Sequence, residues 1–284
     1  MMDSGHVSVM PVEIMEYLCD AAPGTVVDGT AGGGGHTVLL YQAFQGNPVL
    51  AFERDPDTAA FLRKRFAGTG VQVFTGSYTS IPKVISENNL APATAALFDL
   101  GLSSIQLDEG ERGFSHRLSG PLDMRFDRTS GKPAWEHMMR MTEKQLADVI
   151  YRYGEEGRSR VIAREIKRSG KIRTTEELAQ AVRRAVRGNP VKPFSRVFQA
   201  LRILVNEELE HLERMLSEMH QWTARGCRIA ILTFHSLEDR MVKLHFRDSE
   251  FFSRFDPPWM VPSKEEIRAN SRSRSARLRL GVRL

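Results

Sequence analysis

The sequence predicts a doubly wound α/β domain that is interrupted by an inserted all-helical domain. Over the first 100 residues, short apolar runs that end in an acidic residue alternate with helical patterns. The alternation then stops, and it returns after Gly226. Strands that alternate with helices form a parallel sheet covered on both faces. We therefore assign residues 1–106 and 196–284 to the α/β domain and residues 107–195 to the insert.

Four strands and three helices are predicted in the first part of the α/β domain. Asp28, Glu53 and Asp99 close three of the four strands. Either Asp55 or Asp57 is suited to cap the second helix. The predicted strands cover residues 25–28, 49–53, 71–74 and 95–99, and the predicted helices cover residues 36–44, 56–66 and 80–88. Because ligands of open α/β sheets bind at the carboxyl ends of the strands, the three acids mark a candidate binding edge.

The middle of the chain is expected to begin as a loop and to continue as helices. Gly101–Gly131 is rich in Gly, Ser, Asp and Arg and lacks a clean period, which predicts a long loop. TEKQ at 142–145 and TTEE at 174–177 fit the capping box that begins a helix. The apolar stripe from about Arg196 to Met219 predicts one long amphipathic helix.

The end of the chain returns to the α/β pattern. RIAILTF at 228–234 predicts a buried strand, and Ser236 is expected to cap the helix that follows it. SARLRLGVRL at 275–284 alternates apolar residues with arginines, which predicts a half-buried strand. Its arginines either contact a polyanion or face water at a sheet edge. These arginines are Arg277, Arg279 and Arg283.

Composition places the chain among ordinary soluble globular proteins, since 41% of the residues are hydrophobic and 26% are charged. Only Cys19 and Cys227 are cysteines, and no CxxC pair occurs, which excludes a zinc ribbon. The N-terminal MMDSGHVSVM lacks the pattern of a secretory signal. No apolar stretch approaches the ~20 residues of a membrane span. We expect a cytoplasmic protein without a membrane partner.

Positive charge is concentrated in two segments. Residues 151–196 hold 13 Lys and Arg against 5 Asp and Glu, and residues 264–284 hold 7 against 2. This distribution predicts a polyanionic partner, with a nucleic acid as the expected one. A solvated basic helix face is the alternative.

The strongest local signal is DGTAGGGGH at 28–36, between the first predicted strand and the first helix. Glycines there let the backbone approach a ligand closely. Glu53 follows 20 residues after Gly33, a spacing that suits a carboxylate holding both hydroxyls of a ribose. This combination fits a dinucleotide and S-adenosylmethionine alike.

Acidic residues around this loop favour S-adenosylmethionine. Asp28 at the head of the loop would attract the cationic end of that cofactor and repel a pyrophosphate. Asp99 adds a second acid at the same edge, and no GxxxxGK[ST] motif occurs. The histidines lack HxxxH or HExxH spacing, so no metal site is expected. HSLED at 235–239 cannot form a hydrolase triad, because neighbours on one turn cannot adopt that geometry.

The chain also carries a series of longer motifs along nearly its whole length. They are HVSVMPVEIMEYL, DGTAGGGGH, FERDP, DLGLSSIQLDEGERGFS, GPLDMRFD, YGEE, FQALRILVNEEL, FHSLEDRMVK and SRSRSARLRL. Together these motifs resemble the RsmH (MraW) methyltransferases. The resemblance implies a class I S-adenosylmethionine-dependent methyltransferase domain with a Rossmann-like sheet and an inserted helical substrate-recognition domain. It also implies methylation of N4 of a cytidine in the decoding region of 16S rRNA, in the small ribosomal subunit. A homodimer is left open.

Matching the motifs residue by residue implies a set of cofactor-binding positions. They are Gly34, Gly35, His36, Glu53, Tyr78, Asp99 and Gln106. Methylation of an amine also needs a hydrogen-bond acceptor that takes a proton. Asp99 is the first candidate for this role and His235 the second. The Pro-Pro-aromatic residues that follow this acid in many amino-methyltransferases are absent here.

The RNA base is expected to be single-stranded or extruded. Phe114 is a candidate for stacking on it or, alternatively, a buried loop anchor. Arg112, Arg117 and Arg125 are candidates for phosphate contacts. Two other functions fit parts of the pattern: an NAD(P)-dependent oxidoreductase on the same sheet, and a catalytically silent RNA-binding protein that keeps a methyltransferase fold.

Overall fold

The computed structural model describes residues 8–186, 191–257 and 259–284, which form two compact units. Unit 1 combines Met1–Leu102 with Leu209–Leu284, and unit 2 is Ser103–Glu208. The limits expected from the sequence, 107 and 195, both lie inside unit 2. The observed unit extends beyond both expected limits. The larger extension is at its C-terminal end, because α10 (Val191–Asn206) packs against helices of the insert.

Unit 1 contains a seven-stranded sheet in the order β3-β2-β1-β4-β5-β7-β6. All pairs are parallel except those of β7, which runs antiparallel to β5 and β6. The strands are β1 (Thr25–Asp28), β2 (Val49–Glu53), β3 (Val71–Thr75), β4 (Ala93–Asp99), β5 (Thr223–Thr233), β6 (Phe252–Arg254) and β7 (Arg277–Arg283). The strand order runs outwards in both directions from β1, which is the doubly wound arrangement predicted from the sequence.

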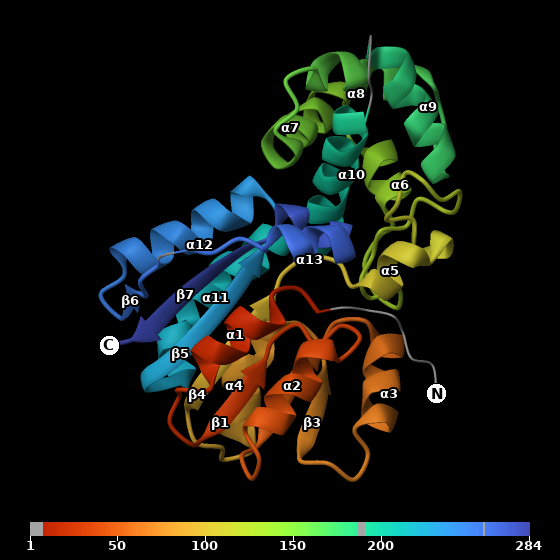
Figure 1. The fold of residues 1–284 in the computed structure, drawn as a ribbon. Coiled ribbons are helices and arrows are strands. Elements are labelled where there is room, and N and C mark those ends of the chain that lie inside the picture. Colours follow the sequence, from red (N-terminus) through yellow and green to blue (C-terminus); the bar gives the residue numbers. More distant parts are fainter. Residues whose placement is uncertain (1–7, 187–190, 258) are drawn as a thin grey trace. The chain divides into compact units, whose positions relative to one another are not determined.

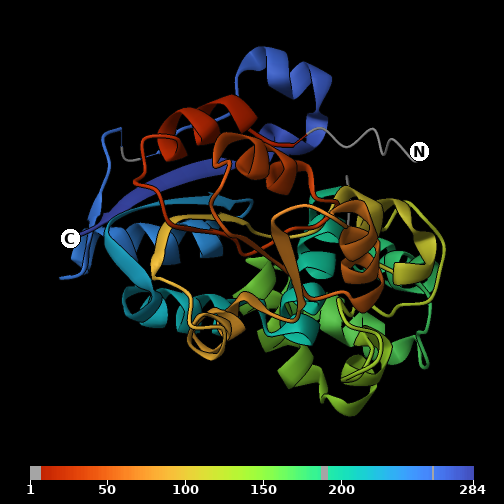
Figure 2. The ribbon, with the colours of Figure 1, turned by 90° about the horizontal axis from the view of Figure 1, so that it is seen from below.

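Helices cover both faces of this sheet (Figure 1, Figure 2). One face carries α1 (Pro11–Leu18), α2 (Gly35–Ala43) and α3 (Pro56–Arg65), and its core includes Leu40 and Leu62. The other face carries α4 (Ile81–Glu87), α11 (Glu208–Trp222) and α12 (Ser236–Asp248), with a core that includes Phe98 and Phe246. A bilayer-crossing helix, which needs both length and apolar character, is absent from the described residues.

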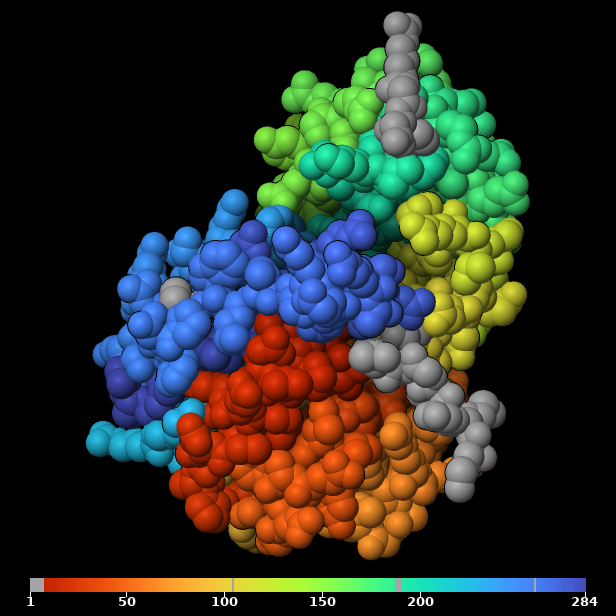
Figure 3. Space-filling model, in the orientation of Figure 1, coloured from red at the N-terminus to blue at the C-terminus, as the bar shows by residue number. Residues whose placement is uncertain are grey.

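The C-terminal part of unit 1 lies beside its first helix. Helix α13 (Lys264–Ala269) precedes the 3-10 turn η3 (Ser271–Ser275). Met10 N donates to Glu266 Oε1 at 2.8 Å, and Figure 3 shows the α13 region in blue against α1 in red. The N-terminal prediction of no secretory signal rests largely on residues 1–7, which lie outside the described residues.

Strand β7 is an inner strand, so the expectation that its arginines face water at a sheet edge is wrong for Arg279. This side chain is 5% exposed, and it donates from Nε and Nη2 to the two carboxylate oxygens of Asp239 at 2.8 and 3.0 Å. Arg277 Nη1 donates to Asp239 Oδ2 at 2.9 Å. Strand β6 covers the edge that the sequence left open, and Asp239 of α12 neutralises the buried cation.

Helix α12 begins one residue earlier than the predicted cap implies. His235, not Ser236, is the N-cap residue, because its backbone is extended and its Nδ1 accepts from Glu238 N at 3.4 Å. Ser236 is the first residue of the helix.

Unit 2 is helical, and both predicted capping boxes are confirmed. Thr142 opens α7 and Thr174 opens α9, each with the reciprocal bond from the third residue of the helix. The predicted long loop contains α5 and the 3-10 turn η2. The helices are α5 (Ser104–Asp108), α6 (Ala134–Arg140), α7 (Glu143–Gly154), α8 (Ser159–Arg168), α9 (Thr175–Ala185) and α10, and η2 is Gly110–Arg112.

The single helix predicted over 196–219 is wrong, because α10 ends at Asn206 and α11 begins at Glu208. Glu207 has φ 51°, a left-handed conformation that interrupts an α-helix. The Asn206 side chain accepts from Phe126 N at 2.8 Å and donates to Met124 O at 2.7 Å. The break therefore lies where the end of α10 anchors the loop of unit 2.

Candidate functional site

The loop after β1 is bound to the ends of the two neighbouring strands. Gly29 N donates to a carbonyl oxygen of β4 at 2.8 Å, and Ala31 N donates to one of β2 at 2.9 Å. Thr30 Oγ1 accepts from Asp99 N at 2.5 Å. The loop backbone is thus fixed at the carboxyl edge of the sheet, the predicted binding edge.

At two positions in this loop, a residue with a side chain would collide with neighbouring side chains, and at one of them the backbone also has a positive φ. Gly34, the N-cap residue of α2, has φ 81°, and a Cβ there would lie 2.8 Å from Leu62 Cδ2. A Cβ on Gly29 would lie 2.2 Å from the Phe98 ring. The glycine-rich sequence therefore permits a compact loop whose backbone a ligand can approach.

Glu53, the last residue of β2, joins the loop to the strand edge. Its Oε2 accepts from Gly32 N at 2.9 Å, and its Oε1 accepts from Asp55 N at 2.8 Å. Burial raises the pKa of Glu53 to about 7, although these two N–H groups act in the opposite direction. Each carboxylate oxygen retains a second lone pair. The carboxylate can therefore accept from two further donors, as the two hydroxyls of a ribose would require.

Asp99, at the end of β4, lies beside the first turn of α2. Its Oδ2 is 3.4 Å from His36 Nδ1, and His36 Nε2 is 3.0 Å from Val9 O. A neutral imidazole donates from only one nitrogen, so these two acceptors favour the imidazolium form. Burial by itself would lower the pKa of His36, but the carboxylates of Asp99 and Asp28 together raise it above its ordinary value.

Tyr78 begins the 3-10 turn η1 (Tyr78–Ser80), which follows β3. Its ring packs edge-on against Phe98, with ring centroids 5.7 Å apart, and it also contacts the ring of His211 at 6.5 Å. The side chain is half-buried. The core therefore fixes the ring at the same strand edge while part of it stays exposed.

Asp28 has a role that the sequence did not reveal. It has no exposed surface, and its Oδ1 and Oδ2 accept from Thr30 N at 3.2 Å and from Thr37 Oγ1 at 2.6 Å. Burial raises the pKa of Asp28. Because the carboxylate is fully buried and organises the loop from beneath, direct contact with a cationic ligand is not supported, and an attraction through water stays a prediction.

The remaining predicted cofactor contact, Gln106, belongs to unit 2, whereas the others belong to unit 1. It is buried and forms the capping box of α5 with Ser103. Its role toward a cofactor stays a prediction.

Two of the predicted RNA contacts are internal to unit 2. Arg112 is buried and donates to Phe126 O at 2.9 Å, so it is not available to a phosphate in this arrangement. Phe114 is also buried, and its ring lies 5.7 Å from that of Phe126, which favours the loop-anchor alternative. Arg125 forms a two-pronged ion pair with Asp123 at 2.8 and 2.9 Å.

The basic segment 151–196 is partly neutralised by its own acids. Arg184 Nε lies 2.7 Å from Glu165, and Glu156 lies within 3.4 Å of Arg158 Nε. Exposed cations remain, such as Arg183 on α9, whose guanidinium lies 5.7 Å from the Phe194 ring centre. The exposed cations are compatible with both sequence interpretations, so the polyanion surface stays a prediction.

Three contacts of the site had no signal in the sequence. They are the His36–Asp99 pair, the Thr37–Asp28 bond and the Thr30–Asp99 bond. The pairing of β1 with β4 brings Asp99 to His36 and Thr30, and the packing of α2 behind the loop brings Thr37 to Asp28.

Known proteins are similar to this chain along nearly its whole length. Residues 3–283 match the model of the MraW methylase family. A ribosomal RNA small subunit methyltransferase H of Rhodopirellula baltica is 41% identical and covers 99% of this chain and 92% of its own length. The enzyme of the same name from Rippkaea orientalis is also 41% identical, and the match covers 98% of this chain and 92% of the relative's own length. A solved rRNA methylase from Streptococcus thermophilus superposes with a TM-score of 0.45 and 10% identity over 98% and 99% of the two chains.

The resemblance predicted from the motifs is thereby confirmed. The chain belongs to the MraW methylase family.

Proposed function

We propose that this protein transfers the methyl group of S-adenosylmethionine to N4 of a cytidine in the decoding region of 16S rRNA. The observation that carries the proposal is the loop at the edge of β1, β2 and β4, with Glu53 and Asp99 at neighbouring strand ends, in a member of the MraW methylase family. The names of the relatives support rRNA of the small subunit as the substrate. The motif resemblance supports the cytidine amine.

In this proposal, the residues of unit 1 bind and orient the cofactor. S-adenosylmethionine supplies, when bound, a methyl group on a positively charged sulfur. The Glu53 carboxylate would accept hydrogen bonds from the two ribose hydroxyls. The backbone of Gly34, Gly35 and His36, in the first turn of α2, would contact the methionine part of the cofactor. Tyr78 provides an aromatic wall. Holding donor and acceptor at near-attack distance supplies much of the rate enhancement.

Asp99 is the residue that we propose to accept a proton from the cytosine amine. The lone pair of N4 is delocalised into the ring. A carboxylate that accepts a hydrogen bond from an N–H of the amine makes N4 a better nucleophile. His235 is less suited, because its Nδ1 caps α12 and its Nε2 lies 3.1 Å from Glu238 Oε1.

Cofactor affinity is expected to rise with pH through the range in which Glu53 ionises. Its pKa is about 7, so the affinity for S-adenosylhomocysteine should increase roughly tenfold between pH 6 and pH 8. Isothermal titration of the full chain across this range measures the effect. The Glu53→Gln variant should bind more weakly and without this pH dependence. An identical slope in the variant would show that another group is responsible.

The same raised pKa has a consequence for the ligand-free protein. Between the ordinary value of 4.5 and about 7, the folded state binds a proton that the unfolded state releases. The stabilising contribution of protonated Glu53 is therefore complete below 4.5 and is lost as the pH rises through about 7.

The cations of the basic segment 151–196 are expected to provide salt-dependent RNA affinity. Replacing Arg183, Arg184 and Arg187 by Glu should weaken RNA binding and reduce its salt dependence by about 0.7 log units per lost phosphate contact. Arg187 lies outside the described residues. Affinity for S-adenosylhomocysteine should be unchanged. Filter binding at several salt concentrations is the measurement, and unaltered RNA affinity would remove these residues from the interface.

The proposed reaction is tested with small ribosomal subunits from a strain that lacks this protein. The full chain and labelled S-adenosylmethionine should transfer one methyl group, which mass mapping should place on a cytidine N4 of the decoding region. Titration with NAD(P) should give no binding. Binding of NAD(P) would favour the oxidoreductase alternative, and cofactor binding without turnover would favour the silent RNA-binding protein.

A further inference from the structure

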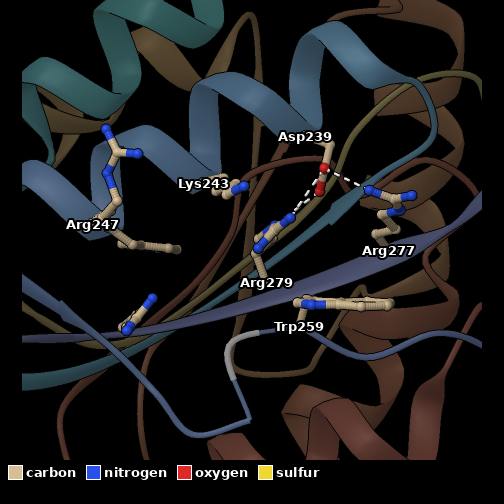
Figure 4. A pocket seen from close by; sticks show the side chains of 8 residues that line it. Asp239, Lys243, Arg247, Trp259, Arg277 and Arg279 are labelled. Atoms are coloured by element: carbon tan, nitrogen blue, oxygen red, sulfur yellow. Dashed lines mark hydrogen bonds and ion pairs between the residues drawn. The ribbon is translucent and has the colours of Figure 1, made fainter.

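A pocket in unit 1 lies away from the loop after β1. It has a volume of about 330 Å³ and is lined by residues of α12, β6, β7 and the segment between β6 and α13 (Figure 4). None of its lining residues belongs to the candidate cofactor site. The strand order separates the two places, because β7 and β6 are at one end of the sheet and β1 and β2 lie towards the other.

The pocket is strongly basic. Five of the eight side chains that line it are Lys or Arg, and only Asp239 is acidic. Asp239 is already engaged by Arg277 and Arg279, and Arg247 pairs with Asp248. Lys243 and Arg254 are exposed and have no acidic partner in the described part of the chain. Two cations therefore remain for an anion from outside.

The pocket also presents an aromatic face. Trp259 is 46% exposed, unlike Trp222, which is 2% exposed. The backbone beside it is anchored, because the next residue, Met260, exchanges two backbone hydrogen bonds with Leu278 of β7, both at 2.9 Å. The guanidinium of Arg277 lies 5.5 Å from the Trp259 ring centre, and Figure 4 shows the ring beside Arg277 and Arg279. An exposed indole next to cations is an arrangement on which single-stranded bases stack.

The neighbouring cations are held at different strengths. Arg279 is buried and bound by Asp239 through both prongs, so it serves as a fixed wall. Lys243 on α12 and Arg254 on β6 are on separate elements of the same pocket. A phosphate between them would be contacted from two sides, and the volume is near the lower end of the range for small-ligand sites.

We propose that this pocket binds one nucleotide of a single-stranded stretch of the rRNA substrate, distinct from the nucleotide that is methylated. The base stacks on Trp259, and the adjoining phosphate binds Lys243 and Arg254. This inference rests on the proposed function, because it takes RNA as the substrate. It assigns the basic end of the chain a part in substrate binding that is separate from the cations of unit 2.

The test uses the full chain with two sets of variants. Trp259→Ala removes the aromatic face, and Trp259→Phe restores a stacking surface. Lys243→Glu with Arg254→Glu reverses the two lining cations for which residues 8–186, 191–257 and 259–284 offer no acidic partner. Lys64→Glu with Lys83→Glu is the matched control, because it reverses two exposed charges on α3 and α4, near the β3 end of the sheet.

Fluorescence anisotropy with a labelled single-stranded RNA of the decoding-region sequence is the readout. Trp259→Ala should weaken binding about tenfold, and Trp259→Phe should recover most of it. The double reversal at 243 and 254 should weaken binding at least as much and lower the salt slope by about 0.7, for the one phosphate contact that is lost, whereas the control pair should do neither. Affinity for S-adenosylhomocysteine should be the same in all variants.

The outcomes separate this inference from the proposed function. If the wild-type chain binds and methylates small subunits while the pocket variants behave like the control pair, the pocket is not an RNA site. If the wild-type chain does not act on RNA, the proposed function itself is wrong. Loss of binding to anionic phosphatidylglycerol vesicles in the pocket variants, with RNA binding unchanged, would overturn the inference in favour of a lipid headgroup.

Discussion

Replacing Asp99 by Ala is expected to lower kcat by about 10²- to 10³-fold, since a positioned proton acceptor typically contributes at least this much. Asp99 is the last residue of β4, and its side chain is 21% exposed, which is enough for the carboxylate to contact a ligand. Single-turnover methyl transfer to small ribosomal subunits measures the effect.

The Asp99→Asn variant is the matched control, because it keeps a carbonyl oxygen that accepts a hydrogen bond but loses the charge. We expect it to retain intermediate activity. Titration with S-adenosylhomocysteine separates the two roles that compete for Asp99. A loss confined to kcat identifies an effect on the amine, whereas an equal loss of cofactor affinity in both variants would assign the residue to cofactor binding alone.

Replacing Asp239 by Ala is expected to destabilise the protein by roughly 3–5 kcal/mol, which is the usual effect of removing one partner of a buried ion pair. Arg279 would stay 5% exposed without its carboxylate, while the half-exposed Arg277 would turn to water. Chemical denaturation of the two proteins measures the difference in free energy of unfolding.

The double variant Asp239→Leu with Arg279→Leu tests the reason for that loss. Removing both charges should recover part of the stability, because no buried cation is then left unpaired. Arg279 and Arg277 outweigh the effect of burial and lower the pKa of Asp239 below its ordinary 3.8. Its stabilising contribution is therefore present above pH 3.8 and is lost as the pH falls through the lowered pKa. A double variant as unstable as Asp239→Ala would contradict this explanation.

Much of the fold could be predicted because its signals are local. The strands that end in Asp28, Glu53 and Asp99 are apolar runs closed by an acid, and the structure ends each of them at that residue. The boxes at Thr142 and Thr174 involve residues three apart, which a sequence shows directly.

The predictions from the sequence were wrong where residues far apart in the chain determine the local structure or the burial of a side chain. A single left-handed residue, Glu207, divides a pattern that is amphipathic on both sides of it. Arg279 appeared to be a solvent-facing residue of an edge strand because neither the covering strand β6 nor Asp239 is near it in the sequence. Asp28 was correctly placed at the head of the loop, but its partner Thr37 and its complete burial come from packing.

The central claim is that the edge formed by the loop after β1, Glu53 and Asp99 binds the methyl donor. A crystal structure of the full chain with S-adenosylhomocysteine tests this most directly. The predicted result is a ligand whose ribose hydroxyls contact the Glu53 carboxylate and whose methionine part lies against the backbone of Gly34 and Gly35. A ligand bound at any other place, with this edge closed by the protein's own side chains, would contradict the account.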